Sequence, residues 1–147
     1  MVKIATTALH VEHDKKKNLE KYFHYIDEAA AQKVDLILFP ELSLQGFAES
    51  MSTLNVRDAL YANASAELVP EGESTQALIE KAKACNMYIA WGMYEKDEAK
   101  ADIIYNTAVL VGPEGYVGKY RKVHQPMTDM IYYTSGTEYP VFETRLG

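Results

Sequence analysis

Cysteine is almost absent from the sequence: Cys85 is the single one among 147 residues, so no disulfide can form within the chain. A lone thiol fits a reducing compartment, and the sequence predicts a cytoplasmic protein. Long apolar runs are missing too, because nothing approaches the roughly 18 consecutive apolar residues of a membrane span. The apolar stretch near the N-terminus is too short and too interrupted for a signal peptide. We therefore expect no membrane association.

Basic residues are also few: the sequence has 15 Lys and Arg against 21 Asp and Glu, which gives a net charge of −6. No stripe of basic residues follows one element, so we expect no nucleic-acid partner. The histidines His10, His13 and His24 lack the mutual spacing of metal ligands, so the sequence predicts no metal and no cofactor. The hydrophobic share of 48% is ordinary for a globular protein, and 147 residues favour a single domain.

Apolar residues alternate between strand and helix spacing along the chain. The first 39 residues read as strand, amphipathic helix and buried strand, which is typical of a βαβ unit with parallel strands. Ser74 and Asn86 are expected to cap a later helix, and Lys33 to lie in the last turn of the first. The predicted helices are 14–33, 56–65 and 74–86, and the predicted strands are 3–11, 35–39, 87–95, 103–111, 116–122 and 140–144. This order predicts an α/β fold with helices on a mixed sheet, whose ligands gather beyond the C-terminal ends of the strands.

A carboxylate stands at such a strand end. In "DLILFPELSLQGF", residues 35–47, an apolar strand runs into Pro40 and Glu41. Proline lacks an N–H and ends the strand, and the neighbouring leucines and Phe39 are expected to desolvate the acid. Desolvation raises the pKa of a carboxyl group toward the range useful for proton transfer. A general base and a solvated loop acid both fit the position, and the apolar neighbours favour the base.

A second candidate lies in "GKYRKVHQP", near the end of a predicted hairpin. Side chains alternate along a strand, so Tyr120 and Lys122 share one face while Arg121 points to the other. We expect Lys119 and Arg121 to be exposed hairpin residues. An ammonium group buried near a carboxylate is costly unless the two are paired, and Lys122 in that place could stabilise an oxyanion.

"FPELSLQGF" and "GKYRKVH", in this order and context, resemble motifs of the nitrilase superfamily of carbon–nitrogen hydrolases, and the resemblance runs over essentially the whole chain. It implies a two-layer α/β sandwich that forms αββα layers when dimerised, a homodimer, and a small-molecule amide, nitrile or carbamoyl substrate. The family uses a Glu–Lys–Cys triad, in which Glu41 would be the general base and Lys122 would hold the charge on the attacked group. Many members carry a further glutamate after the lysine, and Asp129, a shorter acid, stands there as the candidate assisting acid.

The resemblance also implies an absence, because the family's nucleophilic cysteine follows a segment like "VFETRLG", where this chain stops at Gly147. We therefore expect residues 1–147 to be the N-terminal half of the domain, incomplete at the C-terminus. We expect this half to be inactive alone, and either to form a homodimer or to associate with a missing C-terminal half. A naturally truncated product, a fragment of a longer chain and one half of a two-chain enzyme all fit the sequence. Cys85 lies on the apolar side of a predicted helix and is expected to behave as a small hydrophobe.

Two alternatives to the hydrolase remain. A non-catalytic binding or interaction subunit with the same scaffold would explain the missing nucleophile and the shorter acid. A metal-assisted nuclease using Asp35, Glu41 and Lys122 is disfavoured, because the two acids lie near opposite ends of one strand, ~18 Å apart at strand rise. Tyr132 and Tyr133, in the irregular stretch after the lysine, would line a substrate pocket or pack in the core.

Overall fold

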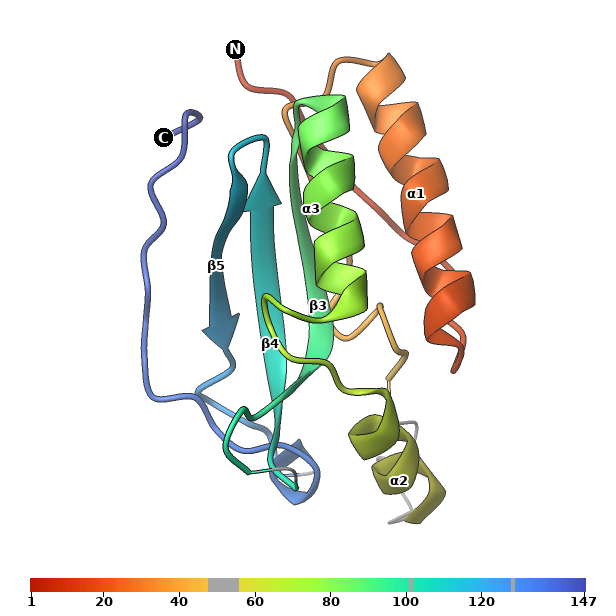
Figure 1. Cartoon of the computed structure of the whole chain (residues 1–147), viewed down its shortest axis with the longest axis vertical. Coiled ribbons are helices and arrows are strands. Elements are labelled where there is room, and N and C mark those ends of the chain that lie inside the picture. Colours follow the sequence, from red (N-terminus) through yellow and green to blue (C-terminus); the bar gives the residue numbers. More distant parts are fainter. Residues whose placement is uncertain (48–55, 101, 128) are drawn as a thin grey trace.

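The computed structural model describes residues 1–47, 56–100, 102–127 and 129–147. Within them, a five-stranded sheet has the order β1 (Ile4–Thr6), β2 (Leu36–Leu38), β3 (Tyr88–Lys96), β4 (Ile104–Gly112) and β5 (Gly115–Arg121). The first three strands are parallel. β4 runs antiparallel to both β3 and β5, and Figure 1 shows β4 and β5 pointing in opposite directions. The predicted mixed sheet and the parallel pair at its start are therefore confirmed.

Three helices of the described residues lie where periodicity predicts them: α1 (Lys15–Ala31), α2 (Val56–Ser65) and α3 (Glu73–Cys85). The short 3-10 helix η1 (Asp129–Ile131) lies in the irregular stretch, where no helix was predicted. The Asp14 side chain caps α1 by accepting a hydrogen bond from the backbone N–H of Lys17 at 3.1 Å. Asn86 ends α3 in the left-handed conformation, as predicted. Among these described helices, none combines the length and the apolar character needed to cross a bilayer.

Two predictions about helix ends are wrong. Lys33 lies beyond the end of α1 and has a φ of 56°, so it is part of the turn into β2 rather than the last helical turn. Ser74 lies inside α3, whose N-cap is Gly72. The Glu67 carboxylate replaces the expected serine cap, because it accepts hydrogen bonds from the backbone N–H of Ser74 at 2.9 Å and from its hydroxyl at 2.8 Å.

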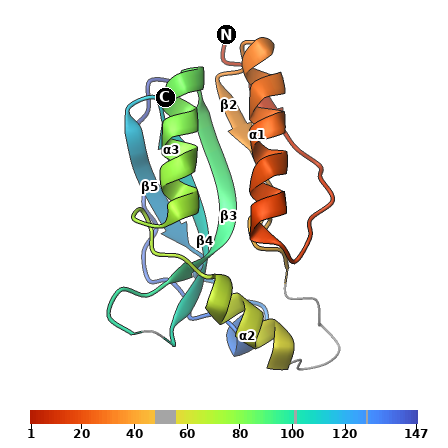
Figure 2. The same cartoon turned by 45° about the vertical axis from the view of Figure 1, so that its right-hand side comes forward.

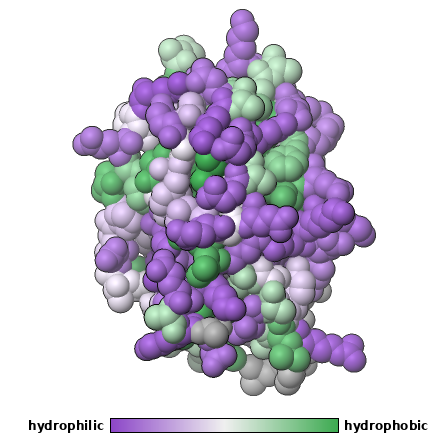
Figure 3. Space-filling model, viewed as in Figure 1, coloured by the Kyte–Doolittle hydropathy of each residue, from purple (hydrophilic) through white to green (hydrophobic). Residues whose placement is uncertain are grey.

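α1 and α3 lie side by side on one face of the sheet (Figures 1 and 2). Every second strand residue points to that face, so Ile37, Ile89 and Val111 form a row under the helices. Burying one such side chain contributes about 1.5–3 kcal/mol. The opposite sides of the helices face solvent, and the molecular face in Figure 3 is mostly hydrophilic there. Helix residues in this core are Tyr22, Ile26, Ala29, Leu78, Ile79 and Ala82.

Residues 140–144 do not form the predicted strand. Pro140 has no N–H for a sheet ladder, and side chains hold the segment in place instead. The Phe142 ring covers Gly118 so closely that a Cβ atom at position 118 would lie 2.2 Å from it. Arg145 donates a hydrogen bond to Asn86 Oδ1 at 2.8 Å. The C-terminal segment thus packs along the sheet without extending it (Figure 1).

Candidate active site

Glu41 lies just beyond the C-terminal end of β2, in a tight turn. The Leu42 backbone has a φ of 51°, and the Ser43 N–H donates a hydrogen bond to the Pro40 carbonyl at 3.3 Å. This turn directs the Glu41 carboxylate toward Lys122, whose Nζ lies 2.7 Å from Oε1 across 81 residues of sequence. The structure therefore brings the two sequence-derived candidates into direct contact.

Lys122 is held from two sides directly after β5. Its backbone N–H donates a hydrogen bond to the Asn106 carbonyl of β4 at 2.8 Å, which continues the hairpin ladder by one more residue. Its ammonium group also contacts Asp129 Oδ2 at 3.0 Å. Although Asp129 is shorter than a glutamate, η1 brings its buried carboxylate within hydrogen-bonding distance of Lys122.

The charges of the site differ from the sequence-based expectation. The Glu41 side chain is 48% exposed, because Leu42 and Leu44 turn into the core instead of surrounding it. Partial burial raises the pKa of Glu41, but the hydrogen bonds from Lys122 and Asn106 outweigh it and leave that pKa below its ordinary value. The expected rise is therefore wrong. Burial lowers the pKa of Lys122, and the two neighbouring carboxylates more than reverse this, so its pKa is raised. Both groups are charged at neutral pH.

Glu41 and Lys122 border a cavity of 490 Å³ on the sheet face opposite α1 and α3. Much of its wall consists of strand residues whose side chains point away from the helices, such as Ala90 and Ala108. The full lining is Leu38, Phe39, Glu41, Ala90, Trp91, Gly92, Asn106, Ala108, Tyr120, Lys122 and His124. The cavity is thus largely apolar and carries an acid, an amine and an amide.

Gly92 on β3 supports the turn from below. A Cβ atom at this position would lie 2.4 Å from the Leu42 nitrogen and 2.7 Å from the Glu41 Cα. These are backbone atoms, which cannot move aside as a flexible side chain can. Only glycine lets the turn lie directly on the strand.

We expect Gly92→Ala to lower the free energy of unfolding by about 1–3 kcal/mol, because the added methyl group overpacks the turn. Urea unfolding followed by the fluorescence of the buried Trp91 measures the change. Ala108→Ser is the control, since exposed Ala108 lies directly opposite Gly92 in register and should change stability by less than about 0.5 kcal/mol. Equal stability of the two variants would contradict the close packing described.

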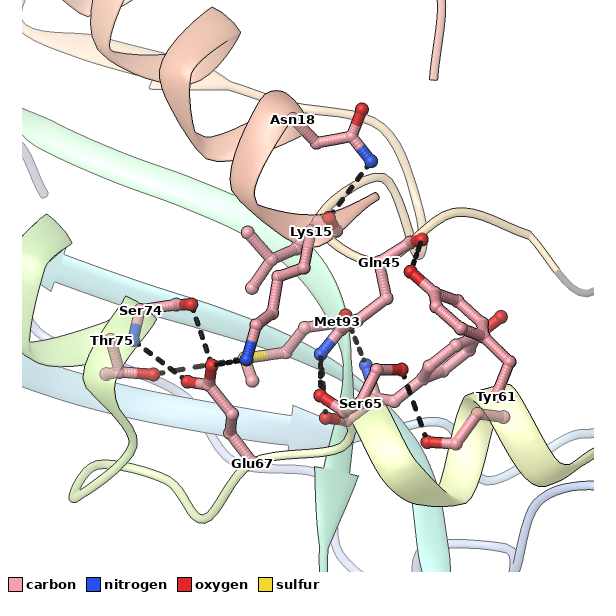
Figure 4. A network of polar contacts seen from close by, with 12 residues as sticks. Lys15, Asn18, Gln45, Tyr61, Ser65, Glu67, Ser74, Thr75 and Met93 are labelled. Carbon is pink, nitrogen blue, oxygen red and sulfur yellow. Dashed lines mark hydrogen bonds and ion pairs between the residues drawn. The ribbon is translucent and has the colours of Figure 1, made fainter. Parts of the chain in front are cut away.

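Hydrogen bonds from three other elements hold the segment that follows Glu41 (Figure 4). The buried Gln45 amide donates to the carbonyls of Ser65 and Tyr94 at 3.2 and 3.3 Å. Asn18 of α1 donates to the Leu44 carbonyl at 3.1 Å, and the Tyr61 hydroxyl donates to the Gln45 carbonyl at 2.6 Å. The turn that carries Glu41 is therefore fixed by α1, α2 and β3 together.

Sequence reasoning missed Asn106. Its side-chain amide donates a hydrogen bond to Glu41 Oε1 at 2.6 Å, and the residue is only 4% exposed. Asparagine is depleted in strands, so its position inside the strand-like run "IIYNTAVLV" is the signal that could have identified it.

A second charged cluster, built around Glu95, lies on the opposite face of the same strands. Glu95 is 1% exposed and accepts hydrogen bonds from Lys119 at 2.5 Å, from Arg121 at 2.6 and 3.0 Å, and from Thr107 at 2.7 Å. Arg121 also lies 3.8 Å above the Tyr105 ring. The prediction that Lys119 and Arg121 are merely exposed is wrong, because a buried acid holds both. The predicted division of Arg121 and Lys122 between two faces is correct.

The structure places the remaining candidates away from the cavity. Tyr133 lies in a second core cluster with Leu42 and Tyr94, and Tyr132 packs against that cluster, so neither tyrosine is in the cavity lining. Cys85, at the end of α3, packs against the main core, and burial raises the pKa of its thiol. Among the described residues, no three His, Cys, Asp or Glu side chains gather as candidate metal ligands.

Comparisons with known proteins point to one family. The carbon-nitrogen hydrolase family model matches residues 3–147. A nitrilase of Pyrococcus abyssi is 35% identical over 139 residues, and the alignment covers 92% of this chain and 48% of that protein. Human omega-amidase NIT2 is 32% identical over 123 residues, covering 83% and 40%. This chain thus spans less than half the length of these two curated relatives.

Solved structures share the fold. Saccharomyces cerevisiae Nit3, a member of branch 10 of the nitrilase superfamily, superposes with a TM-score of 0.80 at 21% identity over 98% of this chain and 52% of that one. The C. elegans NitFhit protein superposes with a TM-score of 0.73 at 21% identity, over 100% and 37%. With the family model matching nearly every residue and the acid and amine paired beyond β2, this chain belongs to the carbon–nitrogen hydrolase family.

Proposed function

We propose that the chain provides the glutamate and the lysine of a Glu–Lys–Cys hydrolase that cleaves non-peptide carbon–nitrogen bonds. The observation that carries this proposal is the 2.7 Å contact between Glu41 Oε1 and Lys122 Nζ at the edge of a largely apolar cavity. The substrate class is a small amide, nitrile or carbamoyl compound. A nitrilase and an omega-amidase among the relatives support that class.

In this mechanism Glu41 accepts the proton of a cysteine thiol, and the electron pair stays on sulfur. The thiolate attacks the carbonyl or nitrile carbon, and charge develops on the attacked oxygen or nitrogen. Lys122 faces that charge and stabilises it. For an amide, the protonated base then gives its proton to the leaving nitrogen, so that ammonia or an amine departs. Water hydrolyses the resulting thioester, with Glu41 again accepting the proton.

We propose that the nucleophile comes from outside residues 1–147, which form the N-terminal half of the domain. Cys85 is a poor candidate because it packs against the core and its pKa is raised. Dimerisation into αββα layers, and a cytoplasmic location, complete this proposal.

The test compares the 147-residue chain with a longer product read from the same gene past codon 147. Both are incubated with simple amides, nitriles and carbamoyl compounds, and released ammonia is measured. We expect turnover only from a product that contains a cysteine after residue 147, with the same rate in its Cys85→Ser variant. This result would identify the downstream cysteine as the nucleophile.

Other outcomes discriminate against the proposal. Turnover by the 147-residue chain that survives Cys85→Ser would rule out the cysteine mechanism. Turnover that Cys85→Ser abolishes would assign the nucleophile to Cys85 itself. If no reading frame follows codon 147 and the chain keeps its biological role as a Glu41→Gln/Lys122→Met double variant, a non-catalytic binding subunit is the better description.

A further inference from the structure

Two donors converge on one oxygen of Glu41. Lys122 Nζ lies 2.7 Å and Asn106 Nδ2 lies 2.6 Å from Oε1. Among the described residues, the hydrogen bonds of the structure leave the other oxygen, Oε2, without a donor. A carboxylate that is held through one oxygen keeps the lone pairs of the other free to accept a proton. The two oxygens of this acid therefore have different surroundings.

The two donors are themselves fixed as a pair. Asn106 and Lys122 lie opposite each other at the end of the β4–β5 ladder, joined by the 2.8 Å backbone hydrogen bond. Asn106 is buried, so its amide has little access to water as an alternative partner. Because the Asn106 amide is fixed in this way, its hydrogen bond holds the Glu41 carboxylate in one position.

From this geometry we propose that Asn106 is a positioning residue, which together with Lys122 holds Glu41 through Oε1 and so leaves Oε2 to take the proton from the nucleophile. The inference deepens the proposed function and rests on it for the identity of the nucleophile as a thiol. In the step concerned, the S–H bond breaks, an Oε2–H bond forms, and the thiolate keeps the electron pair. Asn106 exchanges no proton.

The charged and titratable groups around Glu41 are few. Lys122 contacts it directly, Asp129 contacts it only through Lys122, and Tyr120 and His124 share the cavity wall. Asn106 carries no charge and does not titrate. Its removal therefore changes the hydrogen bonding of Glu41 without changing any formal charge.

The test titrates Glu41 directly in the 147-residue chain. Carbon-13 NMR follows its side-chain carboxyl, and Glu41→Gln assigns the signal. In Asn106→Leu, we expect the pKa of Glu41 to rise by about one pH unit, the lower end of what a hydrogen bond to a charged group supports. The control is Thr107→Val, which removes the 2.7 Å hydrogen bond to Glu95 on the opposite face of the same strand. It should raise the pKa of Glu95 and leave that of Glu41 unchanged.

Asn106→Asp keeps the shape of the side chain and provides a second variant if Asn106→Leu does not fold. It places a carboxyl group against Glu41, and we expect a larger rise in the pKa of Glu41. An unchanged pKa in the folded Asn106 variants would overturn the inference. The inference would also be overturned if Thr107→Val raised the pKa of Glu41 as much as the Asn106 variants do.

A second readout uses the form of the protein that hydrolyses substrate. There, Asn106→Leu should lower kcat by about 10- to 100-fold and leave KM within about twofold. The acid limb of its pH profile should also move to higher pH. An unchanged kcat would overturn the positioning role. If the wild-type protein shows no turnover but the NMR titration gives the expected shift, Asn106 does position Glu41, and the hydrolase proposal is overturned instead.

Discussion

In the hydrolysing form of the protein, Lys122→Met is expected to lower kcat/KM at neutral pH by about 1,000-fold or more. Loss of a single oxyanion donor typically costs about 100- to 1,000-fold. Here the same change also leaves Glu41 and Asp129 facing each other without the cation that contacts both, at 2.7 and 3.0 Å. Two neighbouring carboxylates cannot both ionise easily, so the pKa of Glu41 rises and part of the base is protonated.

This double defect has a distinctive pH dependence. Raising the pH from 7 to 9 should restore part of the Lys122→Met activity, because it ionises Glu41 again without replacing the lost cation. Glu41→Gln should lose about 100- to 10,000-fold in kcat and show no such recovery, since the base itself is gone. Lys83→Met, an exposed change on α3, is the control and should keep wild-type rates. A Lys122→Met variant within tenfold of wild type would show that the lysine does not contact the reacting group.

Glu95→Gln is expected to have the largest effect on stability, lowering the free energy of unfolding by about 3 kcal/mol. Glu95 is almost fully buried and holds two cations and a hydroxyl. A glutamine keeps the shape but turns an N–H₂ group toward donors and leaves Lys119 and Arg121 without their counter-charge. Urea unfolding followed by Trp91 fluorescence measures the loss.

The pH dependence of this difference follows from the pKa of Glu95. Burial raises that pKa, but the hydrogen bonds from Arg121, Lys119 and Thr107 outweigh it and leave it lowered. A lowered folded-state pKa means that the stabilisation is complete above the unfolded-state value and is lost as pH falls through the folded-state value. The free energies of unfolding of wild type and Glu95→Gln should therefore show their full difference at pH 7 and become similar as the pH falls below about 4. Glu80→Gln, a change at an exposed helix position, should cost less than about 0.5 kcal/mol throughout. A gap that widens on acidification would contradict this account.

The sequence was sufficient to identify the features that depend on periodicity. Strand alternation separated Lys122 from Arg121, and the position of Glu41 after a buried strand placed it at the ligand-binding end of the sheet. Both inferences use only the direction of a side chain from its own strand. The helix stripes were predicted from one local period, and the hairpin was predicted from the turn sequence "GPEG" between two strand-like runs.

What the sequence could not reveal depends on partners far away along the chain. The lowered pKa of Glu41 results from hydrogen bonds with Asn106 and Lys122, which lie 65 and 81 residues away in the sequence. No local sequence pattern predicts such long-range contacts. The burial of Glu95 likewise depends on the register of β3 against β4 and β5. Residues 140–144 have a strand-like sequence, yet the contact of Phe142 with Gly118 and that of Arg145 with Asn86 hold this part of the chain outside the sheet.

The β4–β5 hairpin carries a cation for each face on adjacent residues, and this has a consequence for folding. A slip of β5 by one residue would exchange the faces. In one direction Arg121 would take the place of Lys122 beside Glu41, and in the other Lys122 would take the place of Arg121 beside Glu95. Either slip leaves one of the two acids without the cation that it now contacts, so the paired charges favour the correct alignment. Uncharged features favour the same alignment: the Gly115 turn, whose φ of 117° favours glycine, and the irregularity between Leu110 and Val111. The turn at the far end of the hairpin therefore also helps to determine which cation reaches the acid of the candidate active site.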